Sequence, residues 1–198
     1  MVGRPREFDR DEALERARDA FWLRGYEGTS MADLVAVLGL TPPRIYAAFG
    51  SKEDLFREAV SLYRAREGRF AVRALEEEPT ARCAIERMLR DGVKAFLLPG
   101  KPRGCMVVSA ATNCSKSNDA VMDWLTEHRR TRIDAVVDRL RKAVDDGELR
   151  ADADVQALGD YFATVLNGMA ILARDGVPKD RLLALIPPAL RALDTVTA

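Results

Sequence analysis

Residues 29–50 constrain the fold of this chain more than any other stretch. Their first half carries apolar residues at spacings of three and four, as on the buried face of a short helix; these are Met31, Leu34, Val35 and Leu38. Gly39 stands where helices commonly end in a left-handed residue, and Thr41-Pro42-Pro43 supplies the cap and first turn of a second helix. Two short helices joined by a tight turn predict either a plain helical hairpin or a helix-turn-helix, whose second helix can enter the major groove of DNA.

Apolar residues with helical spacing continue through the rest of the chain, whereas the alternation typical of β-strands is scarce. With 198 residues, of which 47% are apolar, the chain can bury a full core. We therefore expect an all-α protein of about nine helices, with a three-helix domain over residues 1–52 and a helical bundle over residues 53–198. No run of about 18 apolar residues predicts a membrane span, and the first residues carry no signal-peptide core. We expect a cytoplasmic protein without a membrane partner.

The charges near the predicted helix-turn-helix suit contacts with phosphate groups. The formal net charge is zero, which argues against coating nucleic acid through bulk charge but not against docking on a small local surface. Arg4 and Arg6 form a short basic arm that can reach a phosphate or the minor groove, and a solvated tail is the alternative. Lys52 stands in the first turn of a helix capped by Ser51, where the helix dipole favours an anion, so an external phosphate would resolve this conflict.

Three motifs around this stretch occur in order and at fixed spacing. They are Gly-Tyr-Glu-Gly-Thr-Ser over residues 25–30, Tyr-Ala-Ala-Phe over residues 46–49 and Lys-Glu-Asp-Leu over residues 52–55. Together they closely resemble the DNA-binding domain of the TetR family of transcriptional regulators, over roughly residues 8–63. The resemblance favours DNA binding over the plain hairpin, and it implies a regulator, in most members a repressor, without enzymatic activity.

Carried over by position, the resemblance implies a role in DNA binding for each matching residue. The base-facing residues would be Thr41, Pro42, Pro43 and Arg44, and the phosphate-contacting residues would be Thr29, Tyr46 and Lys52. Arg44 is the only long donor on the second helix and can pair bidentately with guanine. Many family members have glycine at the Pro43 position, so readout there is expected to shift toward apolar contact with thymine methyl groups.

Two apolar helices are expected at the end of the chain. The first, residues 153–174, is apolar nearly all round, which predicts burial against the bundle on one side and against a partner chain on the other. The second, residues 179–193, is interrupted by Pro187-Pro188, which should kink or restart it. The resemblance implies that both helices pair with their symmetry mates in a homodimer on a pseudo-palindromic double-stranded operator. The expected interface residues are Leu158, Tyr161, Val165, Leu172, Leu182, Leu185, Ile186 and Leu190.

The resemblance further implies that the bundle holds a pocket for a small apolar or amphipathic effector, whose binding releases the operator. Candidate lining residues face the interior of the expected bundle, and core packing is the alternative for each of them. They are Tyr63, Met88, Phe96, Met106, Ser109, Asn113, Trp124, Phe162, Leu166 and Met169. No cofactor and no metal site are expected, because three cysteines at irregular spacing match no ligand motif.

Two other functions fit parts of the sequence. The first is a sensor of copper or of oxidants on the same DNA-binding dimer, with buried inert thiols as its alternative. Its soft ligands would be Cys83, Cys105 and Cys114, with Met106, Met122 and His128. The second is an enzyme or interaction module without DNA binding. The only histidine, His128, lies in a charged stretch that we expect to be solvated, and no catalytic motif occurs.

Overall fold

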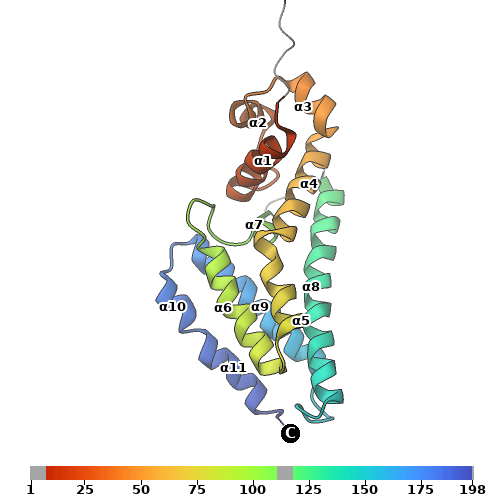
Figure 1. The fold of residues 1–198 in the computed structure, drawn as a ribbon, viewed down its shortest axis with the longest axis vertical. Coiled ribbons are helices and arrows are strands. Elements are labelled where there is room, and N and C mark those ends of the chain that lie inside the picture. Colours follow the sequence, from red (N-terminus) through yellow and green to blue (C-terminus); the bar gives the residue numbers. More distant parts are fainter. Residues whose placement is uncertain (1–7, 111–117, 198) are drawn as a thin grey trace, which may run out of the picture.

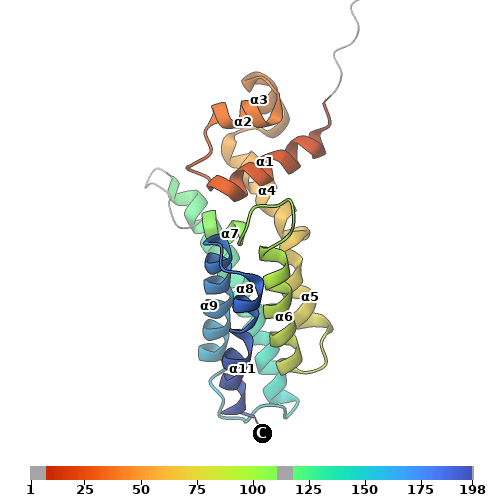
Figure 2. The ribbon, with the colours of Figure 1, turned by 90° about the vertical axis from the view of Figure 1, so that its left-hand side faces the viewer.

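The computed structural model describes residues 8–110 and 118–197, and these residues form helices with a single isolated β-bridge between Leu149 and Thr197. A small head of three helices stands at one end of the molecule, and a bundle of longer helices extends from it toward the carboxyl terminus (Figure 1). Figure 2 shows the same two layers from the side, with α1 lying across the top of the bundle. The predicted all-α architecture is confirmed for the described residues.

The head consists of α1 (Arg10–Arg24), α2 (Met31–Leu38) and α3 (Pro42–Phe49). Asp9 caps α1 through its carboxylate, and Ser30 caps α2 in a reciprocal pair with Asp33. Gly39 ends α2 at a φ of 66°, in the left-handed conformation that its position predicts. Gly39 therefore ends α2 as the sequence predicts, whereas Thr41, the predicted cap of α3, makes no side-chain capping hydrogen bond and the two prolines form the first turn of that helix.

The helix expected after the Ser51 cap is interrupted by a turn. It consists of α4 (Lys52–Ala65), the 3₁₀ turn η1 (Glu67–Arg69) and α5 (Phe70–Glu77). The break falls at Arg66, whose φ of −110° and ψ of −91° lie outside the helical region. Its neighbour Gly68 packs under the Tyr63 ring, where an added Cβ would lie 3.2 Å from the ring. α4 thus runs from the head into the bundle, and α5 continues along the bundle at a new angle (Figure 1).

The remaining helices complete the bundle. They are α6 (Ala81–Phe96), α7 (Met106–Ala110), α8 (Asp119–Asp145), α9 (Val155–Arg174), α10 (Lys179–Leu183) and α11 (Ile186–Asp194). The last expected helix restarts between α10 and α11, with both prolines in the first turn of α11, where no backbone N–H is needed. Together with the break after α4, this restart explains why the described residues carry more helical segments than the nine expected.

One contact between head and bundle is buried completely. The indole of Trp22 on α1 has no exposed surface, and its Nε1 donates to the carbonyl oxygen of Gly104 at 3.2 Å. Its ring stacks edge-on against Tyr63 of α4, with 4.8 Å between centroids. Gly104 has a φ of 84°, and a Cβ there would lie 2.7 Å from the Ala170 carbonyl oxygen on α9. One side chain of the head therefore meets both α4 and the loop before α7.

We expect Trp22→Phe to lower the free energy of unfolding by about 1–3 kcal/mol, because the buried Gly104 carbonyl oxygen loses its donor. Urea denaturation followed by circular dichroism measures the change. Leu23→Ala is the matched control, since its side chain is 55% exposed and its removal should change stability by about 0.5 kcal/mol or less. Equal stability of Trp22→Phe and the parent protein would contradict the assigned role of this bond.

Candidate nucleic-acid interface and bundle cavity

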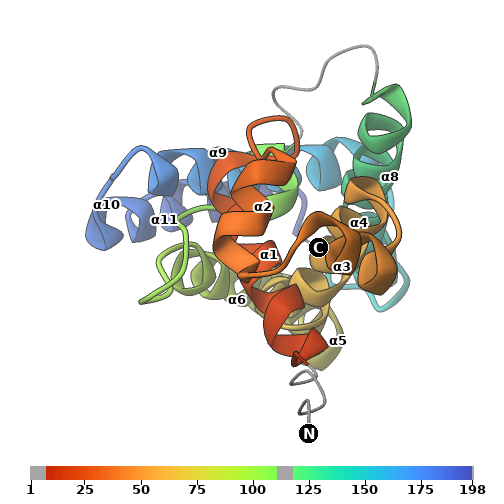
Figure 3. The same cartoon turned by 90° about the horizontal axis from the view of Figure 1, so that it is seen from above.

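α3 presents one polar face outward and packs the other against the head. Ile45 and Phe49 are buried beneath it, at 1% and 3% exposure. The four residues at its start, Thr41, Pro42, Pro43 and Arg44, are all exposed, and Tyr46 is 48% exposed. Figure 3 looks down onto α2 and α3 at the free end of the head. The structure thus brings all the predicted base-facing residues, with Tyr46, onto one open surface.

Arg44 differs from its neighbour Arg10 in what it contacts. Arg10 forms a bidentate ion pair with Glu58 at 2.8 Å and donates from Nε to the Ala48 carbonyl oxygen, which braces the end of α3. The Arg44 guanidinium pairs with no carboxylate of the described residues and lies 5.7 Å from the centre of the Phe8 ring. Its donors therefore remain suited to an external acceptor on the open face of α3.

Lys52 lies at the amino-terminal end of α4, held close to the head. Its Nζ lies 4.3 Å from the centre of the Tyr26 ring, a cation–π contact that places the ammonium group beside the capped helix end. Ser51 caps α4 in a reciprocal pair with Asp54, and the serine hydroxyl lowers the pKa of that carboxyl group. Ser30 does the same to Asp33 at the start of α2. The two serine caps therefore favour the charged form of the Asp33 and Asp54 carboxylates at the starts of α2 and α4.

One predicted contact with DNA, through the Thr29 side chain, is not on this surface. The Thr29 side chain is fully buried, and its hydroxyl donates to the Gly25 carbonyl oxygen at 2.8 Å. A phosphate contact through Thr29 stays a prediction. Arg4 and Arg6 lie outside the described residues.

The head carries a buried charged residue, Arg18, that was not predicted from the sequence. Arg18 is 1% exposed, and its guanidinium nitrogens lie 2.9 Å from the Asp19 carboxylate and 3.0 Å from the Glu67 carboxylate on η1. Only the Nε contact with Asp19 has the geometry of a hydrogen bond. A signal was present, because Arg18 occupies a position in the apolar stripe that also holds Leu14 and Phe21. Arg18 thus ties α1 to the break between α4 and α5.

A cavity of about 150 Å³ lies between α4, α5, α7 and α8. Its lining consists of Tyr63, Arg64, Gly68, Phe70, Ala71, Val72, Leu75, Cys105, Val107, His128, Thr131, Arg132 and Ala135. Burial, together with the nearby Cys105 thiol, raises the pKa of the Tyr63 hydroxyl well above its usual value. Among the described residues of the predicted pocket set, Tyr63 alone lines this cavity.

The other predicted pocket residues lie elsewhere. Six are buried in the core of the bundle with at most 1% exposure; they are Met88, Phe96, Met106, Phe162, Leu166 and Met169. Ser109 lines a separate depression beside the turn after α1, and Asn113 lies outside the described residues. Trp124 is half-buried on α8, where the Arg57 guanidinium lies 5.2 Å from the centre of its ring. The structure does not bring this set together around one space.

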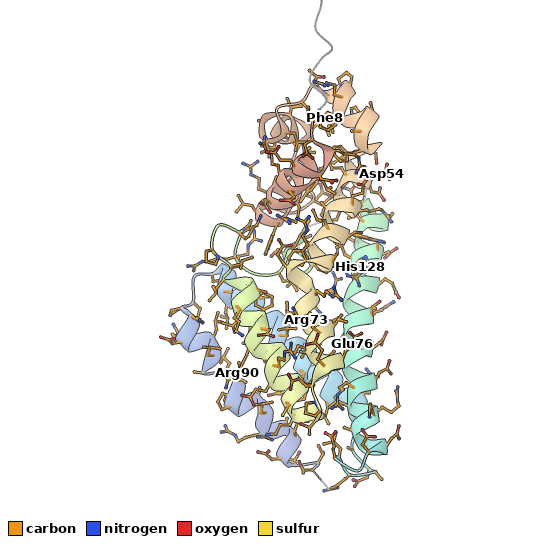
Figure 4. The ribbon with its side chains drawn as sticks, in the orientation of Figure 1. Phe8, Asp54, Arg73, Glu76, Arg90 and His128 are labelled. Carbon is orange, nitrogen blue, oxygen red and sulfur yellow. The ribbon has the colours of Figure 1, made fainter. Side chains whose placement is uncertain are left out.

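His128 lies in a different environment from the solvated one expected. It is half-buried on α8, with its ring edge-on to Trp124 at 4.3 Å between centroids. Its Nδ1 lies 2.7 Å from Nη1 of Arg64 on α4, and Figure 4 shows the side chain facing α4 from α8. Burial and the charges of Arg64 and Arg57 lower the pKa of the imidazole. The expected solvation of this charged stretch was wrong at His128, because its neighbours on α4 cover the ring.

The predicted dimer residues divide between a surface stripe and the core. On α9, Tyr161 and Leu172 are 40% and 37% exposed, and Leu158 and Val165 are half-buried. Leu185, just before α11, is also exposed. Gly168 lies on this stripe, and a Cβ there would meet nothing within 4 Å. Leu182, Ile186 and Leu190 instead face the bundle of their own chain. Ile171 is exposed on α9 and was not predicted.

Both parts of the chain match described families. Residues 13–59 match the bacterial regulatory proteins of the tetR family, and residues 85–186 match the tetracyclin repressor-like C-terminal domain. The chain belongs to the TetR family. It is a DNA-binding transcriptional regulator, as its three sequence motifs predicted. The family is one of regulators and not of enzymes.

Individual TetR-family relatives match along nearly the whole chain. The HTH-type transcriptional repressor ComR of Escherichia coli (strain K12) is 30% identical over 190 residues, which cover 96% of this chain and 90% of that protein. The regulator YezE of Bacillus subtilis (strain 168) is also 30% identical, covering 98% of this chain and 100% of the relative. A cysteine mutant of the TetR-family regulator CifR, solved with 26-bp double-strand operator DNA, is 46% identical with a TM-score of 0.91, covering 96% of this chain and 100% of that one.

The alternative function, a sensor of copper or of oxidants, gains no support from these TetR-family relatives or from the positions of the cysteines. Cys83 is exposed on α6 and Cys105 is buried beside Tyr63, while Cys114 lies outside the described residues. In the part of the chain that the structure describes, no group of three or more His, Cys, Asp or Glu side chains is placed to hold a metal ion. None of the described helices is long and apolar enough to cross a membrane.

We expect Arg18→Ala to lower the free energy of unfolding by about 3–5 kcal/mol, because Glu67 is left as a buried charge without its partner. Arg16→Ala is the control. Arg16 lies on the same helix, is 51% exposed, and pairs with Glu12 in a surface contact that contributes about 0.5 kcal/mol. Thermal and urea denaturation measure the stability of both variants. A similar loss of stability in the two would show that the buried Arg18–Glu67 pair contributes no more than the surface pair of Arg16.

Proposed function

We propose that this protein is a homodimeric transcriptional repressor that acts in the cytoplasm and leaves its operator when a small apolar or amphipathic effector binds in the bundle. The observation that carries the DNA-binding part is the open face of α3, on which Arg44 keeps its donors away from every described carboxylate. The relative ComR, a repressor, supports the direction of regulation, and CifR, solved on operator DNA, supports the binding of an operator. The reading domain is assigned to residues 1–52 and the bundle to residues 53–198.

In the proposed complex, Thr41, Pro42, Pro43 and Arg44 face base edges in the major groove. Arg44 pairs with a guanine through two donors, and the two prolines contribute apolar contact. Tyr46 and Lys52 hold backbone phosphates on either side of the groove, which fixes the position of the head without reading sequence. Arg4, Arg6 and Thr29 are assigned phosphate or minor-groove contacts on the basis of the sequence alone.

Dimerisation is assigned to the stripe Leu158, Tyr161, Val165 and Leu172 on α9, extended by Leu185 and by α10 and α11. Its support is the exposed apolar surface on a helix whose other side is buried, with Gly168 leaving room for close approach of a second helix. A twofold axis here places the two α3 helices on half-sites about 34–36 Å apart, one turn of a pseudo-palindromic operator.

The test of the proposed function is fluorescence anisotropy of the full-length protein with the DNA upstream of its own gene and with a scrambled duplex. Titrations at several salt concentrations separate sequence-selective binding from counterion release. Selection from a random duplex library extends the test if the operator lies elsewhere. A dimer that binds no duplex selectively in either experiment would overturn the proposal.

Substitution of Arg44 and substitution of Lys52 should weaken DNA binding in different ways. We expect Arg44→Ala to weaken binding to the operator by about 1–3 kcal/mol and to relax the preference at one base pair. We expect Lys52→Ala to weaken operator and scrambled DNA alike, and to reduce the slope of log K against log salt by about 0.9. Anisotropy on matched and single-mismatch duplexes measures both. Equal losses on matched and mismatched sites for Arg44→Ala would remove its assigned role in base readout.

Leu172→Glu should give a monomer, because it places a charge within the proposed apolar contact. Sedimentation velocity at micromolar concentration measures the oligomeric state, and operator affinity should fall with it. Leu98→Glu is the control, since Leu98 is similarly exposed, at 39%, but lies in the loop after α6. A Leu172→Glu protein that remains a dimer would place the interface on another face.

A further inference from the structure

The cavity beside α4 has an unusual balance of charge for its size. Its lining includes two arginines, Arg64 on α4 and Arg132 on α8, and no aspartate or glutamate. Neither arginine forms a salt bridge with any described carboxylate. Arg57, seven residues before Arg64 on α4, by contrast pairs with Glu53 at 2.6 Å. Positive charge therefore gathers at this one space without an internal counter-ion.

The present partners of the two arginines are neutral. Arg64 donates to Nδ1 of His128 at 2.7 Å, which requires an imidazole that carries its proton on Nε2. Arg132 donates from Nη2 to the side-chain oxygen of Asn167 at 2.9 Å, which uses one of its five N–H donors. A carboxylate is a stronger acceptor than either partner, because it brings a full negative charge to the guanidinium and can accept two parallel N–H bonds from one arginine.

A third arginine adds to the excess of positive charge on this part of α8. Arg129 is half-buried, and its Nη1 is enclosed without a hydrogen-bond partner among the described residues. Burial and the charge of Arg132 lower the pKa of its guanidinium. An anion next to Arg132 would offset this repulsion.

The rest of the lining is apolar and limits the size of a ligand. Phe70, Val72 and Leu75 on α5 form one side with Ala71, and Val107 and Ala135 lie across from them. A space of about 150 Å³ is that of a cavity known to hold benzene. Arg64 is exposed and Arg132 is half-buried, so a ligand can reach both guanidinium groups from solvent.

We propose that the effector is a small organic carboxylate, whose acid group binds between Arg64 and Arg132 and whose short apolar part fills the space against α5. This inference rests on the proposed function, since it names the chemical class of the effector in the same bundle. The carboxylate takes Arg64 from His128 and thereby changes the contact between α4 and α8. Because α4 begins at Lys52 beside the DNA-reading surface, the changed contact reaches the operator.

The test uses the full-length protein and a series of monocarboxylates, from butanoate to octanoate with benzoate, each paired with its neutral amide. Thermal shift and isothermal titration calorimetry measure binding, and operator anisotropy measures release. We expect at least one acid to bind at least tenfold more tightly than its amide and to weaken operator binding. Equal binding of acids and amides, or no binding by any acid at millimolar concentration, would overturn the proposal.

Three variants locate the acid group. Arg132→Gln and Arg64→Gln should each lose at least tenfold in affinity for the acid and retain operator binding when no ligand is present. Arg130→Gln is the matched control, because Arg130 lies on α8 outside the cavity lining and should bind the acid as the parent does. Unchanged affinity in Arg132→Gln would overturn the proposal. If the parent protein binds no operator in the absence of ligand, that result would contradict the proposed function. Calorimetry would still measure whether the acid binds in the cavity.

Discussion

The docking of α1 onto the bundle is the contact on which the rest of the structure depends. Trp22 inserts its ring beside Tyr63 and donates to the Gly104 carbonyl oxygen, so that the head cannot rotate freely on α4. Arg18 adds a buried ion pair to η1 from the adjacent turn of the same helix. A tight apolar contact and a buried charge act together here. Polar groups enclosed in this way define one arrangement, because any shift leaves them without partners.

α4 serves both the head and the bundle. Its first turns carry Lys52 and pack Phe56 against Phe21 of α1, with 5.1 Å between ring centroids. Its last turns carry Tyr63 and Arg64 to the cavity. A helix transmits a displacement along its length because its hydrogen bonds keep it stiff. The proposed DNA-binding surface and the cavity of the bundle thus lie at the two ends of α4.

Local chemistry made the head predictable, whereas the cavity depends on distant segments. Ser30, Gly39 and the prolines of α3 act within a few residues of themselves, and each sets the helix boundary that the sequence predicts. Arg18 and His128 could not be placed in this way, because their partners lie on elements far along the chain. The predicted pocket residues were chosen as apolar groups facing inward. A buried methionine or phenylalanine has the same pattern whether it packs a core or lines a space, so only the three-dimensional arrangement distinguishes them.

The end of α9 has a consequence for how the two halves of a dimer would move. Arg174, the last residue of α9, donates to the Leu23 carbonyl oxygen on α1, and α9 also meets the loop of Gly104. The head is therefore supported at two places, by α9 on one side and by α4 on the other. Among the described residues, the cavity lining includes Tyr63 and Arg64 of α4 and no residue of α9, although Arg132 of the lining donates to Asn167 on α9. A displacement of α4 would tilt the head about a pivot at α9, so that the two reading helices of a dimer would swing apart or together while the dimer contact itself stayed still.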